Sequence, residues 1–173
     1  YQFTGERELA AFGLDAEGLA ELENPASPES KYLVPRVLIK YLASAAENLR
    51  NFDAVKVFGI QKSFPGSGRP ERKDLVLILT QNPVRGPRRK RGSPDASGLA
   101  SNGAGEEEFY QLKGVVLQML ESMGITDYWY DDATDGERQT DSRQIFHPYR
   151  FAEIKIGDEK IGVIGEVHPQ VLE

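Results

Sequence analysis

Two histidines and two glutamates of this chain could in combination bind a metal ion. His147 and His168 are the only histidines, and each stands directly before a proline. With Glu153 and Glu166 they could supply two imidazoles and two carboxylates, a set that suits a transition metal. Glu166 and His168 share a face of a strand because they are two residues apart, but one hairpin alone does not bring His147 beside them. A metal-dependent enzyme is therefore one alternative, and backbone-bonded His-Pro units at strand ends are the other.

The sequence gives little support for a catalytic nucleophile or for a phosphate-binding loop. Ser63, Ser122 and Ser142 lack the Gly-x-Ser-x-Gly context that exposes a nucleophile on a tight turn. The absence of cysteine excludes disulfides, thiolate zinc sites and thiol nucleophiles. The Gly-rich stretch at 64–70 includes Arg69, but no helix start follows whose dipole could hold a phosphate. We expect no catalytic residues from these patterns.

A basic run is the clearest charge feature of the sequence. Residues 85–91 hold five of the 21 lysines and arginines, although the formal net charge is −6. The run could contact nucleic-acid phosphates through Arg85, Arg88, Arg89, Lys90 and Arg91. It lies within residues 81–105, which are rich in Gly and Pro and too poor in apolar residues to offset chain entropy. We therefore expect 81–105 to be a mobile insertion, and a nucleic-acid-binding module is an alternative function.

The first strong helical pattern covers residues 34–51. Pro35 is compatible with the first turn, where a missing N–H leaves no hydrogen bond unmade. The apolar positions occupy well over half of the circumference, whereas a surface helix shows a stripe of roughly 100°. A helix this apolar is expected to bury one side on its own sheet and another on something else. Burial deep within one domain is the alternative.

The remaining patterns predict an α+β domain with a largely antiparallel sheet flanked by helices. We expect a short helix at 15–22, a strand at 55–60, a fully buried strand at 75–79 and a helix at 107–123 that ends at Gly124. A strand begins at Tyr128, residues 131–143 form a polar loop, and strands 151–156 and 160–167 form a hairpin. The sequence shows neither a run of about 20 apolar residues nor a signal-peptide pattern. A single soluble, cytoplasmic domain with no membrane partner is expected.

Six sequence strings carry a resemblance to a known family. They are NPAS (24–27), YLVPRVL (32–38), VFGIQKSF (57–64), FYQLKGVV (109–116), FHPYRFAEI (146–154) and IGVIGEVHPQVL (161–172). In order and spacing they resemble the catalytic-like module of the bacterial phenylalanyl-tRNA synthetase beta subunit, over roughly residues 20–173. The resemblance implies a class II synthetase-like fold and a fragment of a longer chain.

The resemblance also implies a function without catalysis in this module. The module would pair with the catalytic alpha subunit in a heterotetramer and support the ATP-dependent attachment of phenylalanine to its tRNA. ATP and magnesium would be bound by the alpha subunit, and tRNA by the intact complex. Class II enzymes carry an arginine in their second motif and another after a Gly-rich run in their third. Here the matching places hold Gln61-Lys62 and Gly165-Glu166, so the nucleotide clamp is missing.

The first class II motif is a long helix at the subunit interface, and the helix at 34–51 matches it. The resemblance therefore implies that the partner contacts Val34, Val37, Leu38, Ile39, Tyr41 and Leu42. We expect Val37→Asp or Ile39→Asp to weaken association more than it lowers the melting temperature. The chain departs from the family pattern in having Gly59 and Gln111 at usually acidic positions, and Tyr149 and Phe151 at usually small ones. These departures bear on surface contacts and not on the fold.

Overall fold

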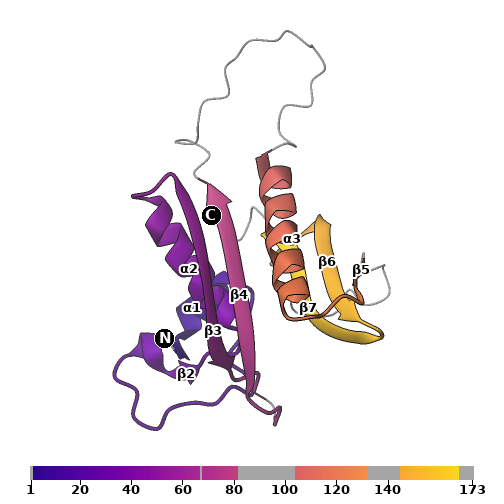
Figure 1. Ribbon diagram of the computed structural model, residues 1–173. Coiled ribbons are helices and arrows are strands. Elements are labelled where there is room, and N and C mark those ends of the chain that lie inside the picture. Colours follow the sequence, from indigo (N-terminus) through magenta and orange to yellow (C-terminus); the bar gives the residue numbers. More distant parts are fainter. Residues whose placement is uncertain (1, 67, 82–103, 132–144, 168–173) are drawn as a thin grey trace. The chain divides into compact units, whose positions relative to one another are not determined.

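The computed structural model describes residues 2–66, 68–81, 104–131 and 145–167. They fall into two compact parts, Tyr1–Pro87 and Arg88–Glu173, and each is described by itself (Figure 1). All the strand pairs of the described residues are antiparallel. The α+β class and the antiparallel pairing are therefore confirmed. Most of the predicted insertion, residues 82–103, lies outside the described residues, as does the loop at 132–144.

The first part begins with short elements. These are β1 (Phe3–Thr4), α1 (Glu6–Ala11), a 3-10 turn (Pro28–Ser30) and β2 (Tyr32–Leu33), and β1 pairs with β2. The predicted helix at 15–22 is wrong, because these residues are irregular apart from a turn at 17–18 and a single β-bridge from Glu21 to Tyr32. Gly18 has a φ of 72°, a left-handed conformation that interrupts a right-handed helix. The Asp15 carboxylate also accepts a hydrogen bond from the Glu17 backbone N–H and so stabilises a turn.

Helix α2 (Val37–Leu49) is the predicted helix of residues 34–51, but it begins three residues later. Val34 is extended instead, since its N–H donates to the Gln2 carbonyl and its own carbonyl accepts from the Phe64 N–H. Residues that precede proline also avoid the helical conformation. Pro35 therefore lies before the helix and not in its first turn, and Arg36 is the N-cap residue. The helix buries Val37, Ile39, Leu42 and Ala45.

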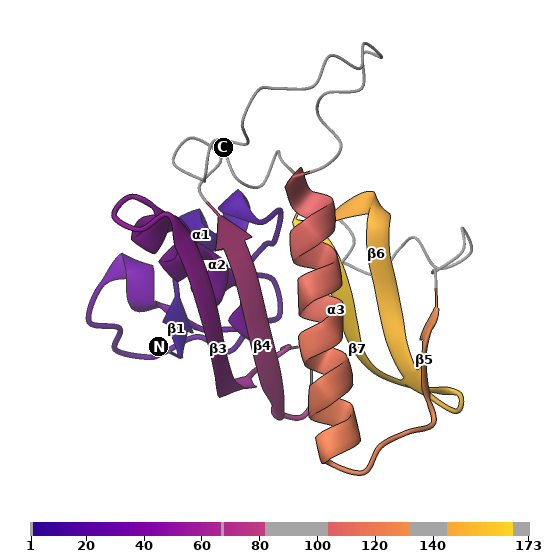
Figure 2. The same cartoon turned by 45° about the horizontal axis from the view of Figure 1, so that its top comes forward.

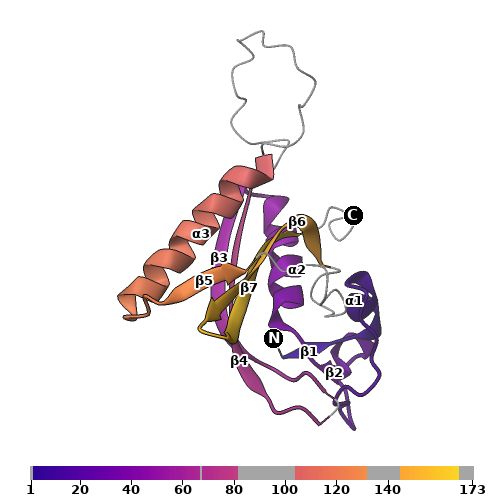
Figure 3. The ribbon, with the colours of Figure 1, turned by 90° about the vertical axis from the view of Figure 1, so that its right-hand side faces the viewer.

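Strands β3 (Ala54–Ser63) and β4 (Arg72–Gln81) form a long hairpin whose pairing runs from Ala54 opposite Gln81 to Ser63 opposite Arg72. Its loop turns at Gly66, which has a φ of 73°. Helices α1 and α2 lie on the same side of this hairpin (Figures 2 and 3), and α2 packs directly on it. Val76 and Ile78 face α2 and are buried. The prediction of a fully buried strand at 75–79 is wrong, because Leu75 on the opposite face is 41% exposed.

The second part consists of α3 (Ala104–Ser122) and a three-stranded sheet of β5 (Tyr128–Asp131), β6 (Phe146–Ile156) and β7 (Glu159–Val167). Strand β6 is central (Figure 2). Helix α3 begins three residues before its predicted start, and Gly124, with a φ of 78°, follows its end as predicted. The predicted hairpin is confirmed, although β6 begins at Phe146 and contains a bulge. The core contains Val116 and Leu120 of α3 with Ala152, Ile154 and Ile164 of the sheet.

Candidate functional site

The six residues predicted to contact a partner lie on or just before α2, and most of them are inside this chain. Val34, Val37, Ile39 and Leu42 are at most 8% exposed, whereas Leu38 and Tyr41 are half-buried. The wide apolar surface of α2 is therefore largely used within its own chain, as the alternative of a deeply buried helix predicts. Whether this helix contacts a partner stays a prediction, but of the six residues only Leu38 and Tyr41 keep appreciable accessible surface. Because Val37 and Ile39 are buried, an aspartate at either position should act mainly on stability, contrary to the expectation that it would weaken association more.

The Tyr41 side chain packs against the backbone of β3 at Gly59, where no side chain is in its way. A Cβ atom built on Gly59 would lie 1.7 Å from the Tyr41 Oη and 2.4 Å from its Cζ. The tyrosine ring thus occupies the space that a residue at position 59 would need. An acidic residue, which the resemblance led us to expect at this position, does not fit beside Tyr41 in this arrangement. Gly59 and Tyr41 therefore form a matched pair.

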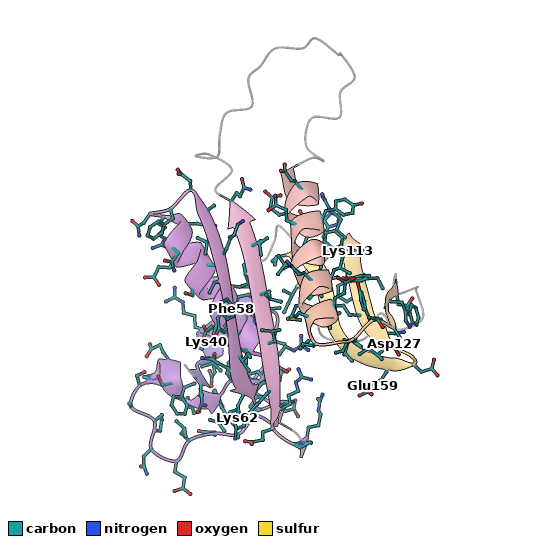
Figure 4. The ribbon with its side chains drawn as sticks, in the orientation of Figure 1. Lys40, Phe58, Lys62, Lys113, Asp127 and Glu159 are labelled. Carbon is teal, nitrogen blue, oxygen red and sulfur yellow. The ribbon has the colours of Figure 1, made fainter. Side chains whose placement is uncertain are left out.

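A second contact joins α2 to the start of the chain. The Lys40 Nζ lies 2.5 Å from the Glu8 Oε2, and the same carboxylate oxygen accepts a hydrogen bond of 2.7 Å from the Thr4 hydroxyl. Thr4 is fully buried, and Lys40 and Glu8 are mostly shielded from water. Figure 4 labels Lys40 on α2. This cluster fixes α1 and β1 relative to α2 and leaves the Lys40 charge paired.

The described residues do not form the metal site that was the alternative interpretation of the histidines and glutamates. His168 lies outside them, and His147 is half-buried near the start of β6. Glu153 pairs with Val163 across the β6–β7 ladder, so Glu166, three residues later on β7, faces the other side of the sheet. Among the described residues, no group of three or more His, Asp or Glu side chains could hold a metal ion.

Both glutamates of that alternative are instead paired with cations. Glu153 has a side chain only 5% exposed, and its Oε1 lies 2.5 Å from the Lys160 Nζ. Its Oε2 lies 3.7 Å from the Lys155 Nζ, which also contacts the Asp131 carboxylate at 2.5 Å. On the other face of the sheet, the Glu166 Oε2 lies 2.7 Å from the Arg150 Nε. A buried carboxylate needs such partners, because the charge would otherwise be left without solvation.

Tyr130 occupies a distinct position between α3 and the sheet. The Lys113 ammonium lies 4.2 Å from the centre of its ring, and the Tyr128 ring meets it edge to face. Its hydroxyl oxygen is buried and has no hydrogen-bond partner within the part of the chain that the structure describes. Burial raises the pKa of Tyr130, and the neighbouring Tyr128 adds to the rise. The hydroxyl therefore stays neutral at ordinary pH.

The candidate serines have structural roles where they are described. The buried Ser63 hydroxyl donates to the Asp74 Oδ2 at 2.6 Å and accepts from the Arg72 Nε at 3.2 Å, which joins β3 to β4. The Ser122 hydroxyl donates to the Met119 carbonyl in the last turn of α3. Ser142 lies outside the described residues. The loop at 64–70 leads into β4, so no helix dipole follows it.

The basic residues of the predicted phosphate-binding run, Arg85, Arg88, Arg89, Lys90 and Arg91, lie outside the described residues. Their role stays a prediction. No helix in the described part of the chain is both long and apolar enough to cross a membrane.

The feature that the sequence reading missed is an exposed apolar surface on the β3–β4 hairpin. Phe58 and Ile60 are 74% and 67% exposed, on the face opposite α2 (Figure 4 labels Phe58, midway along β3). The sequence did contain a pattern that could have predicted this surface. Val55 and Val57 alternate with Phe58 and Ile60, so both faces of the strand are apolar and only one of them can face α2.

Comparison with known proteins identifies the family. The model of the phenylalanyl tRNA synthetase beta chain CLM domain matches residues 1–173. The phenylalanine–tRNA ligase beta subunit of Fusobacterium nucleatum is 29% identical over 167 residues, which is 96% of this chain and 19% of the relative. The beta subunit of Syntrophus aciditrophicus is 29% identical over 99% of this chain and 20% of its own length. That of Lactiplantibacillus plantarum is 28% identical over 98% of this chain and 19% of its own length. This chain, which spans about a fifth of the length of these relatives, belongs to the family of the phenylalanyl-tRNA synthetase beta chain CLM domain.

Proposed function

We propose that this chain is the non-catalytic core module of a phenylalanine–tRNA ligase beta subunit. It pairs with the catalytic alpha subunit in a cytoplasmic heterotetramer and so supports the ATP-dependent attachment of phenylalanine to tRNA. The observation that carries the proposal is the family match, which extends over residues 1–173 and not over a single motif. The α+β architecture with antiparallel sheets is compatible with a class II synthetase-like scaffold, which is part of the proposal.

The absence of catalysis is supported by what occupies the two positions of the nucleotide clamp. Adenylate formation requires fixed cations that neutralise a triphosphate. At the first position, the Lys62 ammonium is held by the Glu71 carboxylate at 2.5 Å, next to the uncharged Gln61. At the second position, Glu166 presents a carboxylate that is paired with Arg150. A triphosphate at these positions would meet a lysine and a glutamate that are both already held in ion pairs. ATP and magnesium therefore belong to the alpha subunit in this proposal.

An exchange assay tests the proposal. Phenylalanine-dependent exchange between ATP and pyrophosphate is measured for the purified chain, for the alpha subunit encoded by the same genome, and for the two together. The chain alone should give no exchange above background, and its addition should raise the exchange by the alpha subunit. The full-length beta subunit is the positive control. Exchange catalysed by the pure chain would contradict the proposal. So would an exchange rate of the alpha subunit that does not change when the chain is added.

A further inference from the structure

We draw no further inference here: the strongest candidate, the exposed apolar patch around Phe58 and Ile60 on the face of the β3–β4 hairpin opposite α2, carries no proposal because nothing in the described part of the chain shows what covers it.

Discussion

Gly59→Ala tests whether the Tyr41 ring and the bare backbone of β3 form a matched pair. The added methyl carbon would lie 1.7 Å, 2.4 Å and 2.9 Å from the Oη, Cζ and Cε1 atoms of Tyr41. No pair of atoms can be held that close, so the ring must leave its place between α2 and β3. Tyr41 is half-buried, and losing its packing should lower the free energy of unfolding by about 1–3 kcal/mol, the usual effect of overpacking.

The same substitution should have the opposite effect once the ring is gone. In a Tyr41→Ala background, the new methyl group meets no ring and replaces a glycine inside a strand. Glycine in that position is destabilising, so Gly59→Ala should then raise the free energy of unfolding by about 0.5–1 kcal/mol. In a Tyr41→Phe background it should remain destabilising, because the Cζ and Cε1 atoms remain.

Urea unfolding of the four chains of the Tyr41→Ala cycle gives the coupling between the two positions. The far-ultraviolet circular dichroism is the suitable signal. Tryptophan fluorescence is not, because Trp129, the one tryptophan, lies in β5 of the second part. A coupling of about 1.5–4 kcal/mol is expected from the two effects above. Equal destabilisation by Gly59→Ala with and without the Tyr41 ring would refute the reasoning.

Three further predictions follow from burial and charge. Ile39→Asp places a carboxylate at a fully buried position of α2 and should lower the free energy of unfolding by about 3 kcal/mol or more; Ala43→Asp, at an exposed position of the same helix, is the matched control in thermal melts. Glu153→Ala removes a carboxylate that two lysines contact and should destabilise by about 1.5–3 kcal/mol, whereas loss of the more exposed Glu71 should change stability by less than about 1 kcal/mol in the same urea titrations. Since the pKa of Tyr130 is higher in the folded chain than in the unfolded one, its contribution to stability is complete below about pH 10 and is lost as the pH rises through the raised value. Tyr130→Phe should therefore make stability fall less steeply above that pH, and an unchanged slope would contradict the assigned cause.

Elements with strong periodicity or strong turn chemistry could be predicted from the sequence. Apolar residues at three-and-four spacing located α2 and α3, and Gly124 marked the end of α3 because a left-handed residue ends a helix without strain. The start of α2 could not be read in the same way. Val34 continues the apolar pattern, but its backbone bonds to Gln2 and Phe64 hold it extended. Such bonds join residues that are distant in sequence, and periodicity does not contain them.

Whether one face or both faces of a strand are buried also cannot be predicted from the sequence of that strand. Residues 75–79 are apolar throughout, which is equally compatible with burial on both faces and with one face open. Only the placement of α1 and α2 on one side of the hairpin distinguishes the two cases. The pairing of Glu153 with two lysines was also missed, because it depends on the register of β6 and β7 and on the bulge beside Lys155.

The central claim is that this chain acts by binding the alpha subunit. The most direct measurement is the native mass of the material obtained when the chain and the alpha subunit of the same genome are co-expressed and purified through a tag on the chain. The account predicts a complex that contains both polypeptides in equal numbers. A wild-type chain that is recovered alone, with the alpha subunit expressed and soluble in the same cells, would contradict it.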